Sequence, residues 1–478
     1  MVTSPPTEAQ ARARDGAIPR GDGAPPPWLA AVPVGIAIAL LPALLVVGAV
    51  IGVAGVGALL ARPRLALYAL AFTVPYQGLA ETRIQGVNVT ATEGVILLLL
   101  AGWGTARAAG RVPAPHLGPL TVAIGLLLSL LILSCTGAAN LVLSAKELVK
   151  WAEVATVIVI GQSLLEHSRH RALLFGALTA AAVSQAVYGL LQSTLLWGPS
   201  HFMIGPWLLR AYGSFAQPNP FGGYLGLHLP LAVSVATFAQ AGRWTRGPLI
   251  VSAALIGTCL IATMSRGAWL GQGTGLLVVA LVGSKAARHA VATFGGLGVV
   301  VVLAAWPVLP AAVTDRVQSI FASLVAFGAG ARALTPENWA VMERLSQWTA
   351  GWRMFAANPL LGVGIGNYNS VYADYRLPEW PVALGHAHNH YLTVAAEAGI
   401  FAVVAYAVLL VVAVRQTVRG WRTASTPFSR AIGLGTLGSI GALATHNMVD
   451  VLFVHGMSVT IGLILLLAGA GAEEPGRE

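Results

Sequence analysis

Three histidines, His386, His388 and His390, lie at alternate positions of one short polar segment. Histidine is the usual general base near neutral pH, so this segment is a candidate catalytic site. Alternate spacing in an extended strand would place all three imidazoles on one face, which also suits a metal ion. No carboxylate or cysteine with ligand spacing lies nearby in the sequence, and we therefore expect no metal here. A purely structural cluster is the third interpretation.

Arg266 interrupts an otherwise apolar stretch, residues 247–284, that is long enough for two membrane spans. An arginine at a membrane boundary is costly unless it is paired or hydrated, which makes it a candidate functional residue. The alternative is a simple turn between two spans, from which the side chain extends to the lipid headgroups.

Arg210 begins a segment rich in glycine, proline and asparagine, 210–220, which predicts a defined loop just before a span. The positions of the basic loops place Arg210 and Arg266 on the same side of the membrane. Two guanidinium groups on one side suit a diphosphate, because each planar fork binds phosphate oxygens in pairs. Pairing of Arg210 with an acidic residue of the chain is the alternative interpretation.

Three further charged residues are supporting candidates. Asp450 follows His446 and Asn447 in the last loop on that side, where its carboxylate could orient a catalytic histidine. Glu397 lies two turns into a predicted helix, where a buried carboxylate could neutralise an arginine of the bundle. Arg344 belongs to a long polar segment on the same side of the membrane.

The composition is that of a membrane protein. Of 478 residues, 56% are hydrophobic and only 10% are charged, whereas soluble domains carry about 25% charged residues. This excludes a soluble enzyme, a nucleic-acid-binding protein and a disordered scaffold. The net charge of +10 reflects basic residues in short loops between apolar segments rather than a nucleic-acid surface. Both cysteines, Cys135 and Cys259, lie in apolar runs, so no disulfide framework is expected.

The apolar runs predict an all-α polytopic bundle of about 12–14 spans, since a span needs about 20 residues. The runs are continuous rather than alternating, which favours helices over a β-barrel. Residues 29–61 form either one oblique span or a hairpin of two. The other predicted spans are 65–79, 92–106, 117–137, 145–165, 171–192, 219–241, 247–264, 267–284, 289–309, 391–414, 431–449 and 454–471.

The sidedness of the bundle follows from its basic loops. The positive-inside rule assigns the loops richest in lysine and arginine to the cytoplasm. These residues are Arg62, Arg64, Arg107, Arg111, Arg169, Arg171, Arg243, Arg246, Lys285, Arg288, Arg415, Arg419, Arg422 and Arg430. The opposite, extracytoplasmic face then carries 193–218, the break at Arg266, the segment 310–390 and the loop near Asp450.

Five regions follow from this topology. They are a disordered cytoplasmic tail (1–28), an amino-terminal transmembrane bundle (29–309), an extracytoplasmic loop subdomain (310–390), carboxy-terminal transmembrane helices (391–472) and a cytoplasmic tail (473–478).

The loop subdomain has a helical signal of its own. Leu345, Trp348, Trp352 and Phe355 recur at helical spacing before Asn358-Pro359, which predicts an amphipathic helix that ends there. We interpret these aromatic residues as packing residues, with a platform for sugar rings as the alternative.

Together these segments resemble the O-antigen ligase and polymerase superfamily of lipid-linked glycan transferases. The resemblance covers about residues 200–450, and the amino-terminal spans agree only in type. The family pattern of His-Asn followed by two spaced glycines is met by His388, Asn389 and Gly399, but Ala402 stands at the last position. The segments that carry the resemblance are 210–219, 265–270, 358–364 and 388–399.

The resemblance implies inverting, metal-independent and cofactor-free glycosyl transfer outside the cytoplasmic (inner) membrane. The donor would be an undecaprenyl-diphosphate-linked glycan, and the acceptor a glycan or a lipid-anchored sugar. In this scheme Arg210 and Arg266 bind the diphosphate, and His388 is the general base for the acceptor hydroxyl, with Asn389 beside it. The other expected partners are membrane lipids, and no nucleic acid is expected.

Two alternatives remain open. A polymerase would use the same donor and site but would transfer to another lipid-linked chain. A small-anion transporter could use Arg210 and Arg266 as binding residues, although transporter sites usually lie near the membrane midplane between internal repeats. No repeat is visible in the sequence, and the polar residues gather at one end of the spans.

Overall fold

The computed structural model describes residues 52–79, 82–84, 87–115, 117–240, 242–286 and 339–469, with positions 288, 289, 304, 307 and 314 between the last two ranges. The tails 1–28 and 473–478 lie outside the described residues, as do most of 29–61, 289–309 and 310–338. The elements discussed here belong to the compact unit that runs from Leu59 to the end of the chain.

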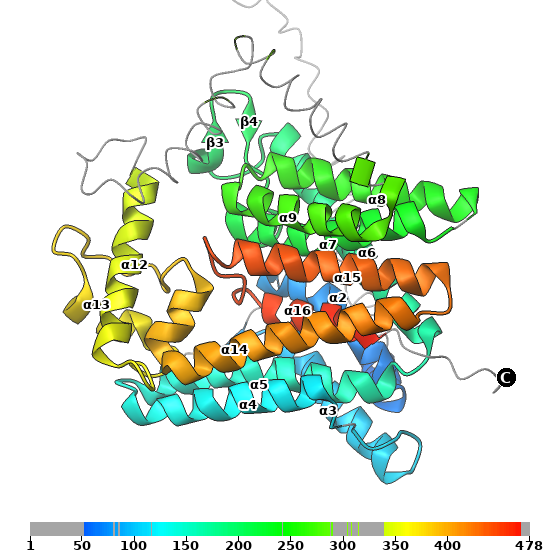
Figure 1. Cartoon of the computed structure of the whole chain (residues 1–478), viewed down its shortest axis with the longest axis horizontal. Helices are drawn as coiled ribbons and strands as arrows, with labels where there is room; N and C mark the ends of the chain where they lie inside the picture. The colour runs from blue at the N-terminus through cyan, green and yellow to red at the C-terminus, as the bar shows by residue number, and fades with distance from the viewer. Residues whose placement is uncertain are drawn as a thin grey trace, which may run out of the picture. The chain divides into compact units, whose positions relative to one another are not determined.

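The protein is an all-α polytopic membrane protein (Figure 1). Its amino-terminal helices are α2 (Pro63–Tyr76), α3 (Ala91–Ala108), α4 (Pro119–Ser134), α5 (Leu141–Leu164), α6 (Ser168–Thr194), α7 (Pro218–Phe238), α8 (Arg243–Ala262) and α9 (Arg266–Gly283). The later helices are α12 (Trp339–Ala357), α13 (Tyr368–Tyr375), α14 (His390–Thr423), α15 (Pro427–His446) and α16 (Met457–Leu466). Two small antiparallel hairpins accompany them, β1 (Thr82–Ile84) with β2 (Val87–Val89) and β3 (Met203–Ile204) with β4 (Leu208–Leu209).

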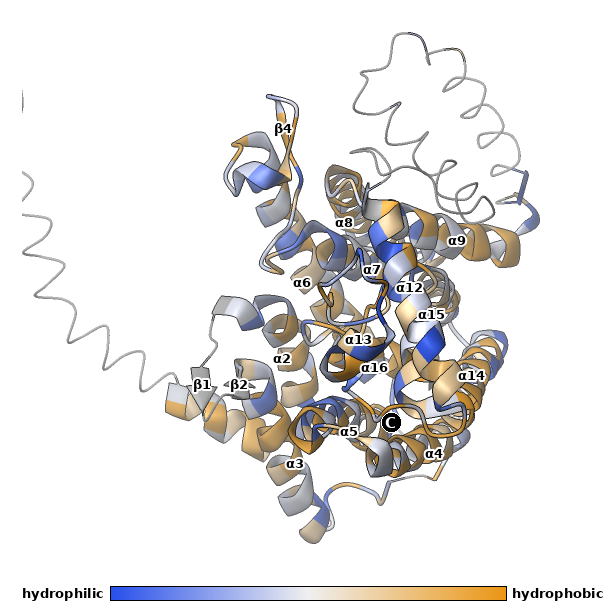
Figure 2. Ribbon diagram, turned by 90° about the vertical axis from the view of Figure 1, so that its left-hand side faces the viewer, coloured by the Kyte–Doolittle hydropathy of each residue, from blue (hydrophilic) through white to orange (hydrophobic). Residues whose placement is uncertain are grey.

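Every predicted span within the described ranges overlaps one of these helices, which confirms the fold class. Five helices in the described part of the chain are long and apolar enough to cross a membrane: Pro119–Gly137, Ser168–Thr194, Pro218–Phe238, Trp244–Ala262 and His390–Thr423. Figure 2 shows hydrophobic residues along α4 and α14, whereas α12 carries many hydrophilic residues. The amphipathic helix predicted before Asn358 is α12, and it ends at Ala357.

The helix α7 forms the centre of the bundle. In its most apolar window 83% of residues are buried inside the protein, compared with 17% for α8, which therefore faces lipid. Small residues allow α7, α9 and α15 to approach closely, as in other membrane helix pairs. Gly275 of α9 faces the carbonyl of Gly438 in α15, and the Ser439 hydroxyl donates to the carbonyl of Leu227 at 2.6 Å.

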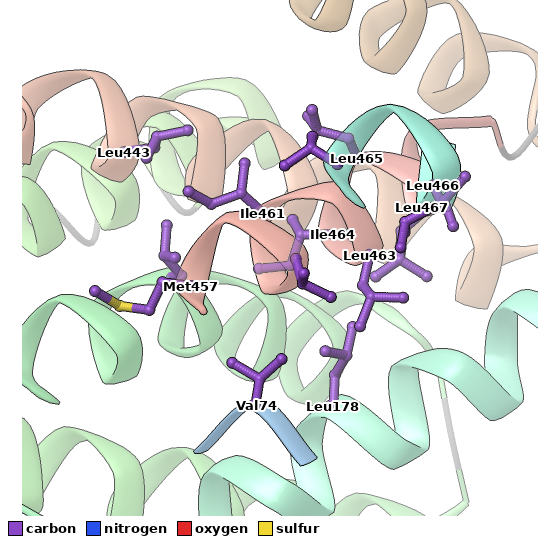
Figure 3. Close-up of a cluster of buried hydrophobic side chains, with 14 of the residues drawn as sticks. Val74, Leu178, Leu443, Met457, Ile461, Leu463, Ile464, Leu465, Leu466 and Leu467 are labelled. Carbon is purple, nitrogen blue, oxygen red and sulfur yellow. The ribbon is translucent and has the colours of Figure 1, made fainter. Parts of the chain in front are cut away.

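The last helix is shorter than the predicted span 454–471. All ten residues of α16 are buried, and Val74 of α2, Leu178 of α6 and Leu443 of α15 point towards it (Figure 3). A ten-residue helix is about 15 Å long, half of the hydrocarbon thickness. The apolar run therefore forms the core of the protein rather than a complete crossing.

A glycine turn, residues 362–367, fits against a kink in α14. Gly362 and Gly364 adopt left-handed φ angles of 67° and 95°, and Gly399 interrupts α14 with φ 73°. The amide of Ile400 donates to the Pro359 carbonyl at 2.8 Å. The positive φ angles of Gly362 and Gly364 thus allow the tight loop between α12 and α13.

Replacing Gly399 by alanine should destabilise the protein. The new methyl group would meet the carbonyl of Leu360, and a left-handed φ at a residue with a side chain costs about 1–3 kcal/mol. We expect a lower melting temperature of the detergent-purified protein. Gly273→Ala is the matched control, because a methyl group there meets nothing within 4 Å. An equal melting temperature for the two variants would contradict the assigned kink.

Candidate functional site

Three elements hold His388 immediately before α14. Its backbone is left-handed, with φ 50°, and the next residue, Asn389, caps α14 by accepting the amide of Leu392 at 3.0 Å. The amide of His390 donates to the Asn447 carbonyl at 2.8 Å, which joins the start of α14 to the end of α15. The indole of Trp348 in α12 donates to the His388 carbonyl at 3.4 Å.

The imidazole of His388 is paired with the carboxylate of Asp450. Nδ1 of His388 lies 3.1 Å from Oδ1 of Asp450, although the residues are 62 positions apart, and the two side chains are only 19% and 13% exposed. The amide of Val451 also donates to Oδ1, at 3.0 Å, which fixes the carboxylate. A histidine that donates from Nδ1 to a carboxylate keeps the Nε2 lone pair for a proton.

Local charges keep Asp450 ionised. Burial acts to raise the pKa of the Asp450 carboxyl, but the hydrogen bond from His388 and the electrostatic interactions with His388, His446 and Arg344 together outweigh it. The net result is a pKa well below the usual range. Asp450 is therefore a carboxylate at neutral pH. This also places the charge of Arg344, in α12, within electrostatic reach of the pair.

His386 lies beside the pair of His388 and Asp450 but is itself uncharged at neutral pH. Its Nδ1 accepts the amide of His388 at 3.1 Å, and the two rings lie 4.6 Å apart. Burial, and secondarily the neighbouring His388, lowers the pKa of His386 to about 4. Its imidazole is therefore neutral at neutral pH.

The third histidine points elsewhere. His390 is buried, with its ring stacked on Phe453 at 4.4 Å and on Trp151 at 6.3 Å. The structure thus does not bring together the three imidazoles that alternate in the sequence. It instead brings His386, His388 and Asp450 to within 4.8 Å of one another, a set that could hold a metal ion. In the structure these atoms engage each other directly, and a metal would have to displace the bond between His388 and Asp450.

Arg210 lies at the end of the β3–β4 hairpin and bridges two other elements. Its Nε donates to the Thr263 carbonyl at 2.9 Å, in the turn between α8 and α9. Its Nη2 donates to Oδ1 of Asn219 in the first turn of α7, at 2.8 Å. The polar loop predicted before the span at 219 thus holds the guanidinium at the entrance to α7.

Arg266 is the first residue of α9. The hydroxyl of Ser265 caps this helix by accepting the amide of Ala268 at 3.4 Å. A methyl group on Gly267 would lie 3.1 Å from Cγ2 of Val449 and 3.6 Å from Nε2 of His446. The residue after Arg266 therefore contacts the segment that carries Asp450.

The amino-terminal part of α7 lies between the turn that holds the two arginines and the segment that carries Asp450. Gly222 faces the turn between α8 and α9, with Thr263 Oγ1 2.9 Å from an added methyl group. Gly223 faces the other way, towards His446 and Leu452. Arg210, Arg266, His388 and Asp450 thus lie at one end of the bundle.

Glu397 lies apart from this cluster in a different environment. Its buried carboxylate accepts the amide of Tyr368 at 2.9 Å and joins α14 to the glycine turn. We expected an arginine as its neighbour. Among the described residues, its hydrogen-bond donors are the backbone amides of Tyr368 and Gly366. The carboxylate therefore holds the glycine turn against α14.

Two residues that the sequence analysis did not single out also belong to this end. Lys150 of α5 donates to the Phe453 carbonyl at 3.0 Å and pairs with Glu147 at 2.6 Å. His446 is 2% exposed, and no described residue hydrogen-bonds to its Nε2, which faces the start of α9. A lysine inside the predicted span 145–165 was a usable signal, because ionisable residues within spans are costly.

Comparisons with known proteins give one family match and one similar solved structure. Residues 251–407 match the family model described as "O-Antigen ligase". No curated protein matches the chain. Among solved structures, the fold is similar to a chain from "Structural coordination of polymerization and crosslinking by a peptidoglycan synthase complex". That similarity has a TM-score of 0.43 and 16% identity, and it covers 73% of this chain and 96% of the other.

Proposed function

We propose that this chain, whose residues 251–407 match the family model described as "O-Antigen ligase", transfers glycan by means of His388, Asp450, Arg210 and Arg266. The donor is a glycan linked to undecaprenyl diphosphate, and the acceptor is a sugar hydroxyl at the outer face of the cytoplasmic membrane. The protein is a membrane glycosyltransferase of the ligase type. The observation that carries this proposal is the 3.1 Å contact between His388 and Asp450 at the Arg266 end of the bundle.

The histidine supplies the base. Nε2 of His388 takes the proton of the acceptor hydroxyl as its oxygen attacks the anomeric carbon of the donor. Asp450 holds Nδ1–H, which fixes the tautomer and stabilises the imidazolium that forms. The bond from the anomeric carbon to the diphosphate oxygen breaks, so the anomeric configuration inverts.

The arginines act on the leaving group. Negative charge grows on the diphosphate as the glycosidic bond breaks, and donors that already point at that position lower the barrier. Arg210 is held in place by Thr263 and Asn219, so that little reorganisation is needed. Arg266 begins an 18-residue helix, whose amino terminus itself favours anions.

The position of the site favours transfer over transport. A transporter of small anions would hold its ligand near the middle of the spans. Arg210 precedes α7, Arg266 begins α9 and His388 precedes α14, so all three lie at helix ends. A polymerase would use the same residues and differs only in the acceptor.

The direct test is an assay of the purified protein with a lipid-diphosphate glycan and candidate acceptors. We expect release of undecaprenyl diphosphate and one new glycosidic bond per donor consumed. Transfer to a lipid A-type sugar identifies a ligase, whereas growth of donor-linked chains identifies a polymerase. His388→Gln protein in the same detergent is the control. Absence of transfer to every acceptor, including the donor itself, would refute the proposal.

Chelation should leave this activity unchanged. His386, His388 and Asp450 bond directly with each other, and the proposed reaction needs only a free Nε2. We therefore expect equal transfer rates before and after dialysis against EDTA. Loss of activity that added zinc restores would assign the same three residues to a metal site instead.

Labelling can test the proposed sidedness. Trp207, between β3 and β4, is 85% exposed, and Ser425 lies in the exposed connection between α14 and α15. After removal of the two native cysteines, we expect Trp207→Cys to react with an impermeant maleimide in intact cells. Ser425→Cys should react only after permeabilisation. The reverse pattern would place Arg210 on the cytoplasmic side and exclude the proposed donor site.

A further inference from the structure

A second site lies at the start of α2. A pocket of about 380 Å³ opens between this end of α2, the carboxyl ends of α3 and α5, and the start of α6. Its lining includes Arg62, Arg64, Arg111 and His170, together with Leu65 and Leu173. The start of α2, the segment after α3 and the start of α6 are far apart in the sequence, and they thus bring these side chains to one cavity.

The pocket is strongly basic. Nε of Arg64 donates to the Leu164 carbonyl at 2.9 Å, which anchors its guanidinium at the wall. Arg62 and Arg111 are exposed, and among the described residues no carboxylate forms an ion pair with any of the three arginines. Pro63 begins α2 here, so the positive end of that helix adds to the potential.

The pocket lies at the opposite end of the bundle from His388. The helix α6 runs from His170, at the pocket, to Ser193, whose hydroxyl donates to the carbonyl of Leu209 beside Arg210. That path is about 35 Å long. Because α6 is long and apolar enough to cross the membrane, the two sites lie near its two surfaces.

The lining also has an apolar side. Leu65 and Leu173 are 36% and 49% exposed at the pocket, next to the arginines. Guanidinium groups bind phosphate oxygens, and adjacent leucines suit the glycerol and the first methylene groups of acyl chains. A soluble phosphate compound without an apolar part would gain nothing from contact with Leu65 and Leu173.

We propose that this pocket binds the phosphate of an anionic phospholipid, taken from the leaflet remote from the His388 site. Basic pockets between membrane helices on one side bind such headgroups. Arg62, Arg64 and Arg111 hold the phosphate, and Leu65 and Leu173 contact the lipid body. The site is independent of glycan transfer and needs no donor substrate.

The test measures lipid binding by native mass spectrometry of the detergent-purified protein. Dioleoyl phosphatidylglycerol should bind more tightly than dioleoyl phosphatidylcholine. The double variant Arg62→Ala/Arg111→Ala should weaken phosphatidylglycerol binding about 30-fold, since each basic residue near an anionic lipid contributes about fivefold. Arg107→Ala/Arg419→Ala is the matched control, because it removes two exposed arginines outside the pocket lining. It should bind within about twofold of the original protein.

Two outcomes would overturn the proposal. Equal loss in both double variants would show that general surface charge, and not the pocket, retains the lipid. Competition by inorganic phosphate at concentrations equal to those of the lipid would identify a soluble phosphate ligand instead. Melting temperatures of all variants separate loss of binding from loss of folding, and a single Leu173→Gln variant, with all arginines present, should also weaken lipid binding.

Discussion

His388→Gln protein should transfer glycan about 10²–10⁴ times more slowly than the original protein, the usual contribution of a positioned general base. Glutamine keeps a polar side chain at this position but accepts no proton at neutral pH. The indole N–H of Trp348 and the carbonyl of Asn447, which hold the segment, remain in place, so folding and donor binding should be retained. Single-turnover rates and donor affinity, measured on the same preparations, separate the two effects.

Matched variants sharpen this result. His201→Gln changes an exposed histidine of η4 (Ser200–Phe202) and should leave the rate unchanged. Asp450→Asn should lower the rate while retaining part of the activity, because the base remains but its tautomer is no longer fixed. A His388→Gln protein with full activity would remove the imidazole from the mechanism.

Arg266→Lys should reduce transfer by about 10–100-fold, corresponding to loss of one or two charge-assisted hydrogen bonds. Lysine keeps the positive charge but lacks the planar fork that binds two phosphate oxygens. If the contact strengthens as the leaving group forms, the rate constant should fall more than donor affinity does. Both quantities follow from the dependence of the initial rate on donor concentration.

The control for this substitution is Arg353→Lys. Arg353 is an exposed arginine of α12, where Nη1 donates to the carbonyls of Tyr375 and Arg376, both at 3.2 Å. This substitution also removes guanidinium hydrogen bonds but lies outside the proposed diphosphate site, so transfer should be unaffected. Equal effects of the two substitutions would indicate a general loss of stability, and no effect of Arg266→Lys would exclude bidentate recognition of the donor.

The helical spans were predictable because an apolar run of about 20 residues usually forms a membrane-spanning helix. The length of α16 was not, because hydropathy records that a segment avoids water but not whether lipid or protein covers it. For α16 the covering comes from α5 and α2, together with α6 and α15. Apolar length alone also gives no weight to the charged residues within α5, which are Lys146, Glu147, Lys150 and Glu153.

The sequence also predicted which residue types form the candidate site, but it did not predict which of them contact one another. His388 and Asp450 lie 62 positions apart, and their contact depends on how α14 and α15 cross. Alternate spacing suggested a common face for three imidazoles, whereas a left-handed residue at His388 and the start of α14 turn His390 into the core. His446 looked like one of several loop residues, and only the packing of α9 on α15 shows where its ring lies.

The hydrogen bond between His390 and Asn447 has a consequence for how the protein is made. Arg210 and Arg266 leave the ribosome first, His388 follows, and Asp450 and the core helix α16 are synthesised after all three. A nascent chain that has inserted α14 but not α15 therefore presents His388, the proposed base, without the carboxylate of Asp450 and without the Asn447 carbonyl that anchors its segment. Under the proposed mechanism, catalytic competence is then acquired only after α15 and Asp450 have been made, and a chain that lacks them would not consume donor lipid.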